Sequence, residues 1–194
     1  MLRDMHLNKI ITLILLSGFV IPLLALLYVS YCGDGDITSC LLKKEDLMPD
    51  FYWHYNTIKY ISIYGNLPDY IIAHKDGGLD GASADGEMKP VFHGPPYYYL
   101  GAGMMILSKF LKLNSLLTLH ILSLLLMLIA NFITFLLFKR LSKHVQNKKL
   151  FIISAVSLSV FLPLHLYIGI AIHNHALFYL FTMFSFYMYV AFLE

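Results

Sequence analysis

The chain has 194 residues, of which 58% are hydrophobic and 13% are charged, and its mean hydropathy is +0.67. This apolar share is far above that of a soluble domain, so the composition excludes a soluble globular protein and predicts an integral membrane protein. The net charge of +2 says little by itself, whereas the distribution of the charges along the chain is informative.

The first apolar run covers residues 10–31 and is long enough to cross a hydrocarbon core of about 30 Å. Arg3 and Lys9 precede it. Because the run is too long for a signal-peptide core and no small-residue cleavage site follows, we predict an uncleaved membrane anchor. Pro22 lies inside the run, and membrane helices tolerate a proline kink.

A long polar loop, residues 32–115, follows the anchor. Cys32 and Cys40 lie at its start. They can close a small disulfide loop if this side is oxidising, or they can be two free thiols, and their spacing matches no zinc pattern. The Gly/Asp-rich composition of segment 76–87 predicts a flexible loop. Its acids suggest calcium binding as an alternative, but their spacing does not fit an EF-hand, so a solvated loop is preferred.

Within this loop, residues 49–64 predict a short amphipathic helix that lies at the membrane surface. Pro49 suits a first helical position, and Gly65 followed by Pro68 is a stop signal. Aromatic residues, which favour the headgroup level, recur at helical spacing on one face. They are Trp53, Tyr60 and Tyr64.

Asp50 and His54 are four residues apart and therefore share a face of this predicted helix. Asp50 falls in the first turn, where the helix dipole favours a charged carboxylate. Two interpretations stay open at this point. The pair is an ionised acid with a histidine neighbour at the water–lipid boundary, or the helix is an interfacial anchor in which Asp50 only marks the start.

The charges predict the topology. The loop 139–149 contains five basic residues and no acid, so it is expected to be cytoplasmic, as is the N-terminus. Both segments can be cytoplasmic only if the short apolar stretch 95–112 does not cross the membrane. We therefore predict a second interfacial or re-entrant helix there. The fold class is then all-α integral membrane, a single transmembrane domain over residues 1–194. The four predicted spans are residues 10–31, 116–138, 150–172 and 176–193.

One face of this topology collects polar groups at span ends and in juxtamembrane segments. Such groups usually face a cavity or the bundle interior, although each histidine taken alone is also explained as a solvated loop residue. The candidates are Asp50, His54, His93, His173, Asn174 and His175. A divalent metal ion held by Asp50 and histidines is chemically possible, but no H-x-x-x-H or H-E-x-x-H pattern occurs.

Other parts of the chain carry weaker signals. His120 and His165 lie within predicted spans and are expected to hydrogen-bond to neighbouring helices. Nucleic-acid binding has no support, because the basic cluster is short and lacks interleaved aromatic residues. No nucleotide-binding or hydrolase motif is present in the sequence.

The order of these features resembles the N-terminal part of the GT-C superfamily of membrane glycosyltransferases, which includes the protein mannosyltransferases, the aminoarabinose lipid A transferases and the RgtA/B/C/D-like group. One span is followed by Pro49–Asp50 at the start of an amphipathic helix. The juxtamembrane element His-Gly-Pro-Pro-Tyr-Tyr-Tyr, residues 93–99, is the most specific part of the resemblance. A short loop with His173-Asn174-His175 follows two spans later.

The resemblance implies transfer of a sugar from a polyprenyl-phosphate donor to an acceptor on the non-cytoplasmic face, with inversion. It implies that Asp50 is the catalytic base that orients the acceptor. His54, His93, His173, Asn174 and His175 would then bind substrate. The implied partners are the lipid-linked donor and membrane lipids, and the implied location is a bacterial inner membrane with a periplasmic active face. The sequence gives no oligomeric state.

Three features differ from the family pattern. Phe51 stands where the motif aspartate is usually followed by Glu, and His175 stands where many relatives have Asp. The chain also supplies only about four spans, whereas family members have many more, so it is expected to be a fragment or a truncated reading frame. The alternative is a small non-catalytic membrane protein, such as an assembly subunit or a binder of a lipid-linked intermediate. A metal or proton transporter ranks last, because no acid lies well inside a span.

Overall fold

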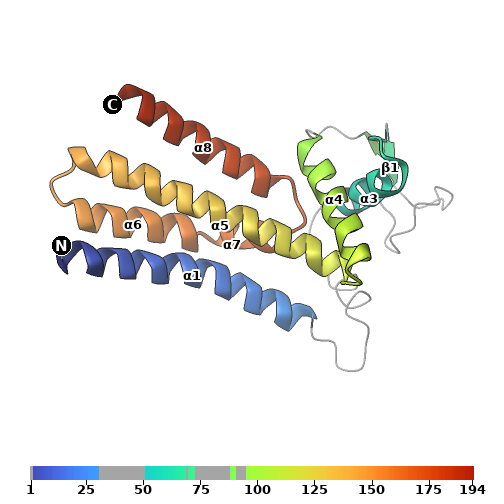
Figure 1. The fold of residues 1–194 in the computed structure, drawn as a ribbon, viewed down its shortest axis with the longest axis horizontal. Coiled ribbons are helices and arrows are strands. Elements are labelled where there is room, and N and C mark those ends of the chain that lie inside the picture. Colours follow the sequence, from blue (N-terminus) through green and yellow to red (C-terminus); the bar gives the residue numbers. More distant parts are fainter. Residues whose placement is uncertain (1, 31–50, 69, 73–87, 91–94) are drawn as a thin grey trace. The chain divides into compact units, whose positions relative to one another are not determined.

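The computed structural model describes residues 2–30, 51–68, 70–72, 88–90 and 95–194 (Figure 1). This part of the chain is almost entirely helical, which agrees with the predicted all-α class. Its helices are α1 (Leu2–Ser30), α3 (Phe51–Tyr64), α4 (Pro96–Phe110), α5 (Ser115–Leu141), α6 (Lys148–Phe161), α7 (Pro163–Ile170) and α8 (His175–Leu193). A short 3₁₀ turn, η2 (Ser142–His144), follows α5, and the strands β1 (Tyr70–Ile72) and β2 (Met88–Pro90) form one antiparallel pair.

Three stretches are long and apolar enough to cross a membrane: His6–Leu27, Ser115–His144 and His175–Leu193. The count rises to four if α6 and α7 together form one span. Large apolar side chains are exposed along these helices, for example Phe178 at 69% and Phe192 at 87% of their surface. Contiguous exposed apolar surface of this kind is typical of helices that face lipid. The structure therefore supports an integral membrane protein.

The chain divides into two compact units, which are described separately. The first unit comprises residues 1–25, 123–170 and 175–194. Its core lies where α1 packs against α6, and the two helices run side by side in Figure 1. The buried members of that core are Ile11, Ile152, Val156 and Val160. A Cβ atom at Gly18 of α1 would collide with Val160, so a glycine is needed for this close approach.

The third predicted span is interrupted. Residues 150–172 were expected to form one helix, but α6 ends at Phe161 and α7 starts at Pro163, with a bend of 56° between them. Proline lacks a backbone N–H, and its ring disfavours helical geometry in the preceding residue. Leu162 accordingly has an extended conformation, with φ −57° and ψ 128°. Pro22, in contrast, lies inside α1 without ending it.

The break between α6 and α7 leaves a carbonyl oxygen at Ser159, because its helical partner would be the missing N–H of Pro163. His165 Nδ1 donates a hydrogen bond to this carbonyl, which fixes the proton on Nδ1. The His165 ring also contacts the ring of Tyr179 on α8, with centroids 4.4 Å apart, and Tyr179 Oη lies 2.9 Å from Ser159 Oγ. His165 thus bonds to the other half of its own predicted span and contacts α8 only through its ring, so a hydrogen bond from His165 to a neighbouring span stays a prediction.

The second unit comprises residues 26–122 and 171–174. It contains α3, α4, the first turns of α5 and the link between α7 and α8. The strands were not predicted: Tyr70 pairs with Pro90 and Ile72 with Met88, on either side of the Gly/Asp-rich segment. At the end of α4, Ser108 Oγ lies 2.6 Å from Ser115 Oγ, which ties α4 to the start of α5.

Local chemistry sets the ends of the two juxtamembrane helices. α3 stops at Tyr64 because Gly65 adopts φ +78°, a left-handed conformation that glycine reaches without strain, and its N–H bonds to Ile61 O at 2.9 Å. α4 starts at Pro96, and Pro95 O accepts the N–H groups of Tyr98 and Tyr99. The Gly65 stop signal is therefore confirmed. The location of both helices at a membrane surface stays a prediction.

Candidate functional site

Helices α3 and α4 pack side by side in the same chain direction. Three residues of α3 meet three residues of α4 in ascending order: His54 meets Tyr98, Ile58 meets Gly101, and Ser62 meets Met105. Parallel packing requires the chain between the helices to return along their length, and residues 65–95 provide this connection. The arrangement brings the same ends of α3 and α4 together, so His54 lies beside the start of α4.

Gly101 allows the close approach of the two helices. A Cβ atom at this position would lie 2.8 Å from Ile58 Cδ1 and 3.0 Å from Ile58 Cγ1, closer than side chains normally pack. Small residues play the same part in helix pairs of membrane proteins, where they let backbones approach. Gly103, on the same helix, has open space around it. The first glycine therefore positions α3, and the second does not.

Three aromatic side chains from distant parts of the sequence meet in this unit, and we call them the His54–Tyr98–His173 cluster. His54 Nδ1 lies 3.0 Å from Tyr98 Oη, and the two rings are stacked with centroids 5.7 Å apart. The His173 ring, from the link between α7 and α8, has its centroid 4.1 Å from that of His54. His54 and Tyr98 are buried, with 1% and 2% of their surface exposed, and His173 is half-buried.

The hydrogen bond restricts the His54 ring in either of two ways. If Tyr98 Oη donates, His54 is neutral with its proton on Nε2; if Nδ1 donates, the phenolic oxygen accepts. Two imidazolium rings with centres 4.1 Å apart would repel each other by about 4 kcal/mol at an effective dielectric of 20, so at least one ring is favoured in its neutral form. The cluster can thus offer hydrogen-bond donors to an anionic group and move a proton.

Two of the predicted substrate-binding residues, His54 and His173, are brought together by the fold. Asn174, the next residue, belongs to the same unit, and its buried Oδ1 has no hydrogen-bond partner within the described residues. His175 is exposed at the start of α8, in the other unit. Asp50 directly precedes α3 in sequence but lies outside the described residues, as does His93.

The predicted Cys32–Cys40 pair also lies outside the described residues. For a metal ion, no group of three or more His, Cys, Asp or Glu side chains occurs within the ranges that the structure describes. The divalent ion considered from the sequence involves Asp50, so it stays a prediction.

Tyr98 is the member of the cluster that the sequence interpretation did not assign to the site. It was noted only as part of the Pro-Pro-Tyr-Tyr-Tyr element. The sequence contained a signal for it, because Tyr98, Gly101 and Met105 recur at helical spacing and so predict one shared helix face. In the structure all three residues are buried on that face of α4. Its partner on α3 is 44 residues away, and nothing in the sequence pattern pairs the two.

No protein-family model, no curated protein and no solved structure matches this chain.

Proposed function

We propose that this chain is a membrane glycosyltransferase of the GT-C type, or the N-terminal part of one. It transfers a sugar from a polyprenyl-phosphate-linked donor to an acceptor at the non-cytoplasmic face, which we take to be periplasmic. The observation that supports this proposal is the His54–Tyr98–His173 cluster. It joins the amphipathic helix, the Pro-Pro-Tyr element and the last link, the three segments that the resemblance assigns to one site.

The cluster also supports the proposed topology, in which α1, α5, the α6–α7 pair and α8 are the four spans. If α4 crossed the membrane, α3 and the link at His173 would lie on opposite faces, and their rings could not be 4.1 Å apart. The length of α4 agrees with this argument, since 15 residues extend about 22 Å, less than the roughly 30 Å hydrocarbon core.

The outer face of α4 is suited to contact with lipid at the membrane surface. Apart from Lys109, the large side chains that are exposed on α4 are apolar or aromatic, and Phe110 is 82% exposed. Ile106 and Leu107 are exposed on the same helix. A short helix with exposed apolar side chains and a basic residue near its end is compatible with a location at the membrane interface. A lipid-linked donor carries its phosphate at this depth, so the site and the phosphate would meet.

In the proposed mechanism, the oxygen of the acceptor hydroxyl bonds to the anomeric carbon of the sugar. Asp50 accepts the proton of that hydroxyl in the same step. The bond from that carbon to the phosphate oxygen breaks at the same time, on the opposite side of the ring, so the configuration inverts. A general base of this kind contributes about 10²–10⁴-fold in rate. His173, which is half-buried, donates a hydrogen bond to the leaving phosphate, which carries the developing negative charge, and the buried His54 ring holds His173 in place.

The remaining predicted ligands, His93, Asn174 and His175, are proposed to bind substrate on the strength of the resemblance. A divalent ion, when bound, would neutralise phosphate charge near Asp50. The proposal does not require one, because imidazole groups also stabilise a leaving phosphate.

The test is genetic and chemical. Deletion of the gene should cause the unused polyprenyl-phosphate sugar to accumulate, and mass spectrometry of lipid extracts would identify it. Wild-type protein should clear the lipid, whereas Asp50→Asn should not, although it reaches the membrane in equal amount. Asp80→Asn, in the Gly/Asp-rich segment, is the matched control and should behave as wild type.

Two outcomes would contradict the proposal. Clearance by Asp50→Asn at the wild-type rate would remove Asp50 from the mechanism. A deletion strain that accumulates no lipid-linked sugar would favour the alternative, a non-catalytic membrane protein that assembles with or binds another component.

A further inference from the structure

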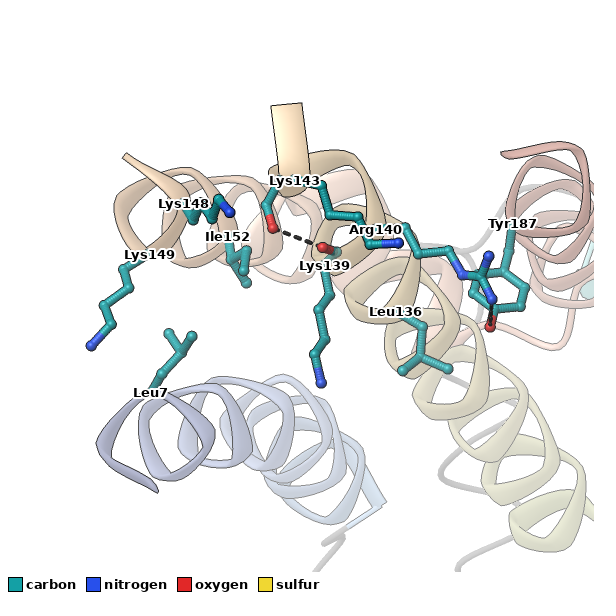
Figure 2. Close-up of a pocket in the computed structure, with 10 residues that line it drawn as sticks. Leu7, Leu136, Lys139, Arg140, Lys143, Lys148, Lys149, Ile152 and Tyr187 are labelled. Atoms are coloured by element: carbon teal, nitrogen blue, oxygen red, sulfur yellow. Dashed lines mark hydrogen bonds between the residues drawn. The ribbon is translucent and has the colours of Figure 1, made fainter. Parts of the chain in front are cut away.

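A basic pocket lies at one end of the first unit, where α5 ends and α6 begins (Figure 2). Leu7 of α1, Ile152 of α6 and Tyr187 of α8 contribute to its lining together with Leu136 of α5. The pocket has a volume of about 550 Å³, which is in the range of small-ligand sites. Its apolar walls are thus the ends of four helices, three of which are long enough to span a membrane.

Five positively charged side chains surround the same pocket. They are Lys139, Arg140, Lys143, Lys148 and Lys149. Among the described residues that line it, there is no acid. Glu194 pairs with two of the five, at 3.0 Å from Arg140 Nη1 and 2.9 Å from Lys143 Nζ, and can balance only one unit of charge. The pocket therefore keeps a large positive potential.

The start of α6 adds to that potential. Its first turn contains Lys148 and Lys149 and, within this described helix, no acid, although a helix N-terminus favours negative charge. Asn147 at the N-cap makes no side-chain capping bond within the described part of the chain. The first backbone N–H groups of a helix have no partner inside the helix and are well placed to bind an anion. Two lysines at this end oppose the helix dipole, and an anion bound between them would offset that effect.

A positively charged rim over apolar walls matches one kind of ligand. A free inorganic anion would gain from the charges and nothing from Leu7, Leu136 or Ile152. A phospholipid presents a phosphate at the headgroup level and acyl chains directly below it, so it satisfies both parts. Basic pockets between membrane helices bind anionic headgroups in this way.

We infer that the pocket binds the phosphate of an anionic membrane phospholipid, at the face that the basic loop predicts to be cytoplasmic. The phosphate lies between the first turn of α6 and Arg140 at the end of α5. The ring of Tyr187 supports this geometry, since its Oη accepts a bond from Arg140 Nη2 at 3.2 Å and its face lies 4.8 Å from the guanidinium. Arg140 is thus fixed beside the pocket before any lipid binds.

The experiment measures binding of dihexanoyl-phosphatidylglycerol to the purified full chain in neutral detergent, by titration calorimetry. Dihexanoyl-phosphatidylcholine tests the need for net charge, and glycerol phosphate tests the need for acyl chains. A lysine near an anionic headgroup contributes about a factor of five, so Lys148→Gln with Lys149→Gln should weaken binding about 25-fold. Lys109→Gln with Lys112→Gln, two exposed lysines of the other unit, removes the same charge and should change binding less than twofold.

Detergent-solubilised protein has no sidedness, so a change of membrane orientation caused by losing basic residues does not affect the result. Equal weakening by the two double variants would show diffuse attraction and overturn the proposed site. Equal binding of the phosphatidylcholine would overturn the requirement for an anionic lipid. Glycerol phosphate that binds as tightly as the phosphatidylglycerol would identify a soluble phosphate ligand and overturn the assignment to lipid.

Discussion

The contact between Gly101 and Ile58 gives the sharpest prediction about the candidate site, because α4 contains its own control. Gly101→Ala places a Cβ atom 2.8 Å from Ile58 Cδ1 and 3.0 Å from Cγ1, so α3 has to shift or the isoleucine has to leave its preferred rotamer. Gly103→Ala, two residues on, meets nothing within 4 Å. Both changes make the same gain in helix propensity.

The free energies of unfolding of the two variants should therefore differ only by the cost of the new contact between Ile58 and the methyl group that Gly101→Ala introduces. Replacing glycine by alanine inside a helix stabilises it by about 0.8–1 kcal/mol, and overpacking a well-filled contact costs about 1–3 kcal/mol. Gly103→Ala should raise the free energy of unfolding by up to about 1 kcal/mol. Gly101→Ala should lower it by up to about 2 kcal/mol, so the expected difference between them is about 1–3 kcal/mol.

The assay is unfolding of the protein in dodecyl maltoside micelles by added dodecyl sulfate, followed by tryptophan fluorescence. Trp53, the single tryptophan of the chain, lies on α3 next to His54 and reports on this helix pair. Ile58→Val removes Cδ1, the nearest atom, and should couple to Gly101→Ala by at least about 0.5 kcal/mol in a double-mutant cycle. Equal unfolding free energies for the two glycine variants would refute the proposed role of Gly101.

Three further predictions concern single side chains. Tyr98→Phe keeps the stacked ring but removes the hydroxyl bonded to His54, and should lower the free energy of unfolding by about 1–2 kcal/mol in the same assay; no change would mean that this bond is not formed in the folded protein. His165→Phe leaves the carbonyl at the α6–α7 break without its donor and should destabilise by about 1–3 kcal/mol, whereas a neutral effect would mean that water replaces the imidazole. The hydrogen bond from Lys143 lowers the pKa of Glu194 from its ordinary value of 4.5. The ionised carboxylate therefore stabilises the fold at pH values above 4.5, and this stabilisation is lost as the pH falls through the lowered pKa. Thermal unfolding between pH 6 and 3 should show this acid-side loss in wild type but not in Glu194→Gln, and superimposable profiles would contradict it.

The parts of the fold that local chemistry determines could be predicted from the sequence. Apolar runs gave the positions of α1, α5 and α8, and Gly65 gave the end of α3. The break at Pro163 was missed because a proline is compatible with a membrane helix, as Pro22 in α1 shows. At Pro163 the freed carbonyl of Ser159 is bonded by His165, and a one-dimensional pattern does not show which proline of a membrane helix marks a break.

Two members of the cluster, His54 and His173, were among the predicted site residues, whereas Tyr98 and the geometry of the cluster were not predicted. The basic loop 139–149 and the even number of predicted spans between His54 and His173 placed both residues on one face of the membrane. Their ring contact, in contrast, depends on the parallel packing of α3 and α4. That packing rests on Gly101, whose fit to Ile58 is visible only in three dimensions. The basic residues of the 139–149 loop were used only to orient the chain, and their convergence on Leu7 and Tyr187 needed the tertiary structure.

The contact between α3 and the last link also has a consequence for synthesis on the ribosome. His54 leaves the ribosome about 120 residues before His173, which at 5–20 residues per second is a delay of roughly 6–24 s. During this time the ring of His54 on α3 lacks its contact with His173. A nascent chain stalled before the link should therefore expose α3 to proteases that do not cut the finished protein, and its lifetime should depend on how quickly translation reaches His173.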